Sequence, residues 1–86
     1  MSEEEITQIV RQALTAVAPE SADQPLDPDL EFRDQLDLDS MDFLNFVLHL
    51  AKASGLTIPE RDYPQLASLS GCLEYLSART QEPASR

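Results

Sequence analysis

The sequence predicts an all-α fold: a four-helix bundle with three main helices, a short third helix and a long first loop. Apolar residues recur at helical spacing in separate segments, and no segment alternates between apolar and polar residues as a strand would. The 86 residues are enough for one domain. We expect that domain to occupy residues 1–80, with 81–86 as a flexible tail.

The first predicted helix covers residues 3–17, where the apolar residues follow the i, i+3, i+4, i+7 spacing of one buried face. Ser2 precedes it as a candidate N-cap, and glutamates stand at the positive end of its dipole. Pro19 ends it. The acidic, proline-containing stretch 19–37 predicts a long loop. Its expected anchors in the core are Leu26, Leu30, Phe32 and Leu36.

The second main helix is predicted over residues 40–53, and Gly55 supplies its C-terminal stop. At 100° per residue, its polar residues fall within roughly an 80° arc. They are Asp42, Asn45, His49 and Lys52. The other positions are mainly apolar: Phe43, Leu44, Phe46, Val47, Leu48 and Leu50. We therefore expect a largely buried helix that exposes one narrow polar stripe.

The last third of the chain predicts two further helical segments. Residues 56–60 are expected to form a connector and 63–66 a short helical turn. A last helix then runs to about residue 78 behind a Ser68 or Ser70 cap. Its expected buried residues are Leu69, Cys72, Leu73 and Leu76.

Acidic residues outnumber basic ones by 16 to 6, and the net charge is −10. Repulsion from phosphates argues against nucleic acid and against anionic membrane surfaces as partners. The charge suits a monomer that meets basic patches on other proteins, or it simply maintains solubility. The acidic residues are densest between Asp27 and Asp42, where only Arg33 opposes them.

The sequence predicts a soluble, cytoplasmic protein without membrane insertion. The single cysteine, Cys72, excludes an internal disulfide and fits a reducing compartment. The acidic first residues do not resemble a secretory signal, and no apolar run reaches membrane-spanning length.

Ser40 lies among aspartates at the start of the second main helix, where a serine is a nucleophile, a helix cap or a point of attachment. A nucleophile needs a base, and the only histidine, His49, would face the opposite side of the same helix. The surrounding residues do not form the G-x-S-x-G elbow. We therefore predict that the protein is not an enzyme. Ser40 or Asp39 could cap the helix, and a cap is compatible with a phosphate ester on Ser40.

The alternating aspartates do not predict a metal site. A calcium loop needs glycine at its sixth position and glutamate at its twelfth, and neither loop that would begin at Asp27 or Asp37 has them. One histidine and one cysteine do not make a zinc site.

The stretch LDLDSMDFLNFV (36–47) resembles the phosphopantetheine attachment motif of acyl carrier proteins. FRDQL (32–36) and GLTIPE (55–60) resemble the family's segments before the motif and after its second helix, and the spacing agrees without gaps. The resemblance implies that a separate phosphopantetheinyl transferase attaches 4'-phosphopantetheine to Ser40. The arm would then carry acyl or aminoacyl groups as thioesters, loaded by a ligase and delivered to acyltransferase or synthase enzymes.

The resemblance also implies two sets of site residues. Recognition by the transferase and the other partners would fall on residues around and after the serine: Asp37, Asp39, Met41, Asp42, Asn45, His49 and Lys52. An acyl pocket between the second and third helices would be lined by Val47, Leu50, Ile58, Tyr63 and Leu66.

Departures from the family pattern point to a specialised carrier for one pathway of fatty-acid or secondary-metabolite synthesis. Asp37 replaces a usual glycine, and the stripe on the second helix, usually rich in glutamate, has a formal charge near zero. Tyr63 replaces what is often a small residue, so it favours a short, polar or aminoacyl cargo unless it simply packs or points outward. The alternative is a helical protein-interaction module that keeps the fold without the arm.

Overall fold

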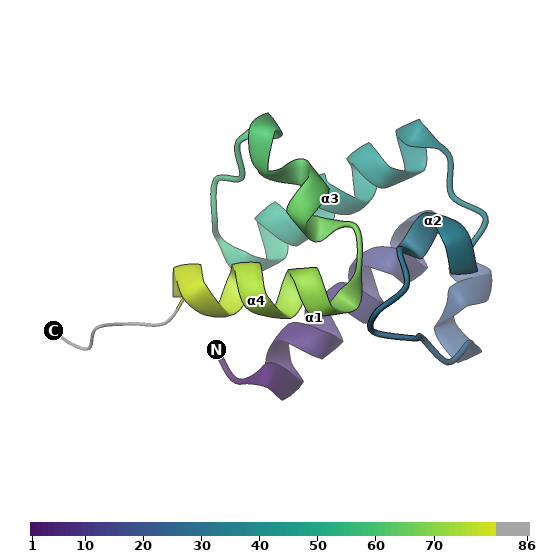
Figure 1. Cartoon of the computed structure of the whole chain (residues 1–86), viewed down its shortest axis with the longest axis horizontal. Helices are drawn as coiled ribbons and strands as arrows, with labels where there is room; N and C mark the ends of the chain where they lie inside the picture. Colours follow the sequence, from purple (N-terminus) through teal and green to yellow (C-terminus); the bar gives the residue numbers. More distant parts are fainter. Residues whose placement is uncertain (81–86) are drawn as a thin grey trace, which may run out of the picture.

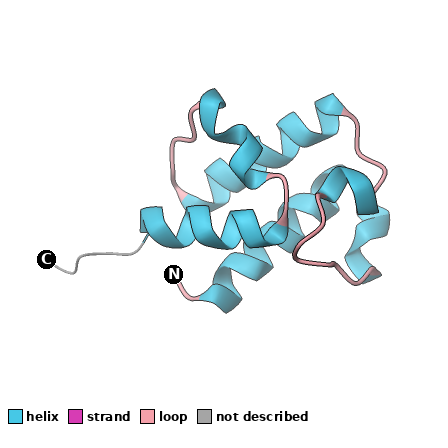
Figure 2. Cartoon of the chain, in the orientation of Figure 1, coloured by secondary structure: helices cyan, strands magenta, loops and turns pink. Residues whose placement is uncertain are grey.

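The computed structural model describes residues 1–80, and the tail expected over 81–86 lies outside this range. Its elements are α1 (Glu3–Val17), the 3-10 helix η1 (Pro19–Asp23), α2 (Phe32–Gln35), α3 (Ser40–Ser54), the 3-10 helix η2 (Glu60–Leu66) and α4 (Leu69–Thr80). Within the described range there is no strand, only an isolated bridge between Glu31 and Ser68 (Figure 2). The predicted all-α bundle is confirmed.

α1 begins and packs as its sequence predicts. The Ser2 hydroxyl accepts a hydrogen bond from the Glu5 N–H at 3.1 Å, and the Glu5 carboxylate accepts one from the Ser2 N–H at 2.8 Å. The bond from this backbone N–H lowers the pKa of Glu5. The buried face of α1 packs against both α3 and α4 (Figure 1). It consists of Ile6, Val10, Ala13 and Leu14.

The segment between α1 and α3 is more structured than the predicted loop, because it contains η1 and α2. The Arg11 guanidinium donates to the carbonyl oxygens of Ser21 at 3.1 Å and Gln24 at 2.6 Å, which ties the end of η1 to α1. The Phe32 N–H donates to the Ala67 carbonyl at 2.7 Å, so the start of α2 is fastened to the end of η2. These bonds join residues far apart in sequence, which is why local patterns did not predict them.

Two of the four predicted anchors of this segment, Phe32 and Leu36, are buried, and Leu26 is partly buried against the core. The prediction was wrong for Leu30, which is exposed. Its N–H donates to the Asp27 carbonyl in a turn, and this turn directs the side chain to solvent. Leu38 is buried in addition.

α3 matches its predicted bounds within one residue and ends at Gly55, whose φ of 76° lies in the left-handed region that glycine adopts readily. The aromatic ring of Phe46 meets that of Phe32 edge to face, with 5.1 Å between centroids. The prediction that only a polar stripe is exposed was wrong. Leu44 and Leu48 have exposed fractions of 38% and 52%, because α3 lies at the edge of the bundle and buries one face only.

η2 and α4 extend beyond their predicted bounds and pack closely on each other. The Ser68 hydroxyl accepts a hydrogen bond from the Gly71 N–H at 3.1 Å, so Ser68 is the side chain that satisfies the start of α4. A Cβ on Gly71 would collide with the backbone carbonyl of Gln65, so glycine allows the close approach of these helices. Tyr75 is buried on α4, whereas Leu73 is only partly buried.

Within residues 1–80, no helix combines the length and the apolar character that crossing a bilayer requires.

Candidate functional site

Ser40 is the first residue of α3, and its side chain is exposed. Asp39, rather than Ser40, caps the helix: its carboxylate accepts a hydrogen bond from the Asp42 N–H at 2.8 Å. The Asp42 carboxylate accepts one in return from the Asp39 N–H at 3.3 Å, which completes a capping box. The Ser40 hydroxyl is therefore not needed for capping and is available for chemistry.

The backbone around Ser40 fits a phosphate ester. The N–H groups of Ser40 and Met41 make no hydrogen bond to any of the described residues, as is usual for the first turn of a helix. Free N–H groups and the positive end of the helix dipole favour an anion at this position. Asp37, Asp39 and Asp42 oppose it by repulsion, so the site as a whole does not concentrate free anions.

His49, the single histidine of the sequence, is not placed to act as a base for Ser40. Ser40 and His49 both belong to α3, nine residues apart. Nine residues correspond to about 13.5 Å along the helix axis and place the two side chains on opposite faces. In the described part of the chain, no three histidine, cysteine, aspartate or glutamate side chains group to hold a metal ion.

The predicted recognition residues lie along the exposed side of α3 and just before it. Asp37 and Asp39 are exposed beside Ser40, and Asp42 is half-buried by its capping role. Met41, Asn45, His49 and Lys52 are all exposed along the helix. Leu44 and Leu48 lie on the same face, where they form an apolar row with Met41. The prediction missed both leucines because helical spacing shows which residues share a face but not whether another element covers that face.

The five residues of the predicted acyl pocket do not share one environment. Val47, Leu50, Ile58 and Leu66 are core residues. Tyr63 is partly buried and lines a surface hollow of about 490 Å³ bounded by η2, the start of α2 and one residue of α3. The other walls of this hollow include Glu31, Arg33, Phe43, Glu60 and Pro64.

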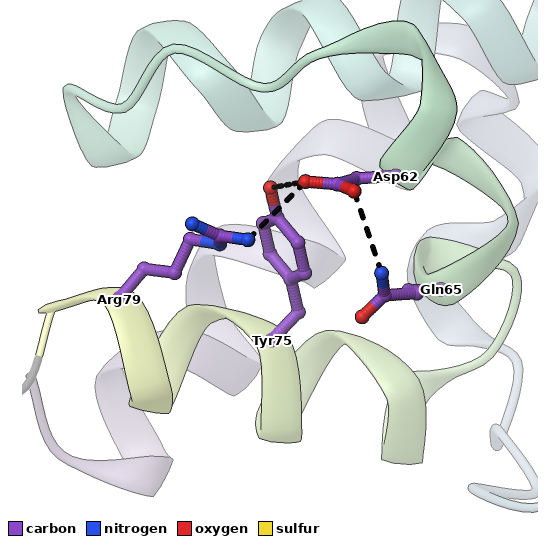
Figure 3. Close-up of polar contacts among 4 residues, drawn as sticks. All are labelled: Asp62, Gln65, Tyr75 and Arg79. Atoms are coloured by element: carbon purple, nitrogen blue, oxygen red, sulfur yellow. Dashed lines mark hydrogen bonds and ion pairs between the residues drawn. The ribbon is translucent and has the colours of Figure 1, made fainter.

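A polar cluster in which Asp62 and Tyr75 are buried joins η2 to α4, and sequence analysis did not predict it (Figure 3). The carboxylate of Asp62, 7% exposed, accepts hydrogen bonds from the Tyr75 hydroxyl at 2.7 Å and from the Arg79 guanidinium at 3.2 Å. The Gln65 amide donates to its other oxygen at 3.5 Å. Burial, followed by the hydrogen bond to Asp62, raises the pKa of Tyr75, which keeps the phenol protonated as a donor. We refer to these four residues as the Asp62 cluster.

Cys72 is a buried free thiol whose sulfur donates to the Leu66 carbonyl at 3.5 Å. Burial raises its pKa to about 12. Because the thiolate is the reactive form, this cysteine has a structural rather than a reactive role.

The protein is a small helical bundle. At the start of its second long helix, α3, it has an exposed serine that does not cap the helix. A family model described as a phosphopantetheine attachment site matches residues 4–76. The chain is 28% identical over 76 residues to an acyl carrier protein of Rubrobacter xylanophilus, covering 88% of this chain and 93% of the relative. It is 36% identical over 50 residues to an acyl carrier protein of Lactobacillus johnsonii, covering 58% of this chain and 62% of that protein.

The fold agrees with these relatives. The solved structure of an acyl carrier protein from Enterococcus faecalis superimposes with a TM-score of 0.74 at 26% identity, covering 93% of this chain and all of that one. The chain therefore belongs to the acyl carrier protein family, whose members bear phosphopantetheine.

Proposed function

We propose that Ser40 bears the phosphopantetheine arm and that the protein carries acyl or aminoacyl groups as thioesters on it. The observation that supports this most directly is the exposed Ser40 hydroxyl at the start of α3, relieved of capping by Asp39. The arm would supply the thiol on which cargo is held. Ser40 needs no internal base, since a separate transferase would activate the hydroxyl, and we propose no catalytic role for the chain itself.

The exposed side of α3 is the surface on which we propose that partners dock. Near Ser40 it is acidic, through Asp37 and Asp39, and at its far end it bears the cation Lys52. Ser40 and Lys52 are 12 residues apart, or about 18 Å along the helix. A fitting partner has basic groups near its active site, an apolar patch for the Met41–Leu44–Leu48 row, and no dense basic row beyond it.

This charge pattern supports a role in a dedicated pathway. Partners whose basic surfaces bind an acidic helix would find little attraction at His49 and Lys52. The proposed partners are a phosphopantetheinyl transferase, a loading ligase, and acyltransferase or synthase enzymes, met by the carrier as a monomer.

Intact mass spectrometry tests the attachment. Co-expression with a broad-specificity phosphopantetheinyl transferase should add the mass of one phosphopantetheine. Ser40→Ala should abolish the gain, whereas Ser77→Ala, at an exposed serine of α4, should keep it. A gain retained in Ser40→Ala would place the arm elsewhere.

The second candidate function is a protein-interaction module without an arm, which the exposed apolar row on α3 also suits. It predicts no mass gain with any transferase while partners still bind α3. Pull-down with Leu48→Glu as the disrupted variant tests whether this binding uses the apolar row.

A further inference from the structure

We propose that the Asp62 cluster is a conformational latch. It holds the first half of η2, residues 60–63, on α4, and this half opens and closes while the second half, residues 64–66, stays anchored. The proposal goes beyond the proposed function, because it concerns the fold and holds with or without an arm on Ser40.

The second half of η2 is fastened to the rest of the protein at several points. The Gln65 carbonyl lies so close to Gly71 that a Cβ there would collide with it. The Leu66 side chain is fully buried in the core. Directly after η2, the Ala67 carbonyl accepts a hydrogen bond from the Phe32 N–H at 2.7 Å. All of these contacts would have to break together for this half to move.

The first half of η2 depends on one side chain. Glu60 and Arg61 are exposed, and Tyr63 is only partly buried. Asp62 is therefore the one buried residue of residues 60–63, and its carboxylate makes the bonds to α4. Pro64 separates the two halves, because it has no N–H with which to continue the backbone hydrogen bonds of the helix.

The contact that holds the first half can open into water at modest cost. In the closed form the Asp62 carboxylate accepts hydrogen bonds from Tyr75 at 2.7 Å and from Arg79 at 3.2 Å. On opening, water replaces these bonds, and the carboxylate regains the hydration that burial had removed. An apolar contact has no such compensation, since opening it exposes apolar surface to water. The open form is therefore a minor state in equilibrium with the closed one.

The α4 side of the latch stays in place when Asp62 leaves. Tyr75 and Arg79 lie one helical turn apart on α4, and the guanidinium carbon lies 4.5 Å from the centroid of the tyrosine ring. Figure 3 shows the two side chains extending from α4 toward Asp62. The Arg79 side chain is 49% exposed, so it is hydrated in both forms. Closing therefore requires only the return of Asp62 to donors that are already positioned.

Relaxation-dispersion NMR of the isotope-labelled protein without an arm tests the proposal. The amides of residues 60–63 should exchange on the microsecond-to-millisecond time scale, whereas those of Leu66 and Ala67 should not. Tyr75→Phe removes one hydroxyl and keeps the ring, and it should raise the population of the minor state about tenfold. Asp62→Asn weakens the acceptor and should raise the population at the same residues.

Two results would overturn the proposal. One is a minor state that is unchanged or undetected in Tyr75→Phe. The other is exchange that extends to Leu66 and to α1 as strongly as to residues 60–63, because the variant would then have loosened the whole fold.

Tyr63→Phe is the matched control, since it removes a hydroxyl from η2 itself but lies outside the Asp62 cluster. It should leave the population of the minor state within about twofold of the wild type. Arg79→Gln should raise the population less than Tyr75→Phe does, because a half-exposed guanidinium is screened by solvent. An effect of Tyr63→Phe as large as that of Tyr75→Phe would also contradict the proposal.

Discussion

Asp39 and Asp62 show two ways in which this protein uses an aspartate. Asp39 is exposed and caps α3 through a residue three positions away, whereas Asp62 is buried and bonds residues 13 and 17 positions away. The Ser40 end of α3 is thus held by local bonds and stays open to solvent. The junction of η2 and α4 is closed by bonds across the fold. We therefore expect the surface proposed for partners to contribute less to stability than the junction of η2 and α4.

The largest expected effect comes from comparing a buried and an exposed residue of α3. Phe46→Ala should lower the free energy of unfolding by about 3–5 kcal/mol, because Phe46 is fully buried against Phe32. Leu48→Ala, half a turn away on the exposed face, should change it by no more than about 0.5 kcal/mol. Urea unfolding followed by circular dichroism measures both. Similar losses would mean that Leu48 is covered in solution.

The two aspartates give the next largest contrast. Asp62→Ala should cost about 2–3 kcal/mol, because it leaves the buried Tyr75 hydroxyl without its acceptor. Arg79 adds little to this, since its side chain is 49% exposed. Asp39→Ala should cost about 1 kcal/mol as a lost N-cap.

A second measurement on the same variants sharpens the comparison. The rate of phosphopantetheine transfer to Ser40 should fall in Asp39→Ala and stay near wild type in Asp62→Ala under conditions where both are folded. A reversed order would place the transferase contact at η2 rather than at α3.

Gly71→Ala tests the close packing of η2 on α4. The added Cβ meets the Gln65 carbonyl, and the resulting shift should cost about 1–2 kcal/mol despite the better helix propensity of alanine. Thermal unfolding measures the loss. Ser77→Ala, an exposed position of the same helix, is the matched control and should leave the melting temperature nearly unchanged.

The stability of the protein should also fall in alkali. Burial raises the pKa of Cys72 from 9.0 to about 12, so the folded protein holds its proton where the unfolded chain has lost it. This leaves stability unchanged below about pH 9 and lowers it as the pH rises toward 12. At pH 10 the loss should be about 1 kcal/mol relative to pH 8. Tyr75, whose pKa is also raised, acts in the same direction at higher pH.

Cys72→Ala provides the control for this pH dependence. Unfolding of the wild type and of the variant at pH 8 and pH 10 should show a smaller difference in the variant. An identical decline in both proteins would contradict the role assigned to the buried thiol.

Local patterns in the sequence determined most of the secondary structure and the position of Ser40. Ser2 capping, the bounds of α3 and the stop at Gly55 each depend on residues no more than four apart, so spacing alone predicts them. The placement of Ser40 at the start of a helix follows in the same way.

The tertiary structure alone decided which apolar residues stay outside and how η2 is held. Leu44 and Leu48 are as apolar as Leu50. They are exposed because α1 packs on the opposite side of α3. The local bond of Asp62 to Gln65, three residues on, does not mark Asp62 in the sequence as a buried residue. Its bonds to Tyr75 and Arg79 exist because packing brings η2 and α4 together, and a contact between distant residues depends on that packing rather than on spacing along the chain.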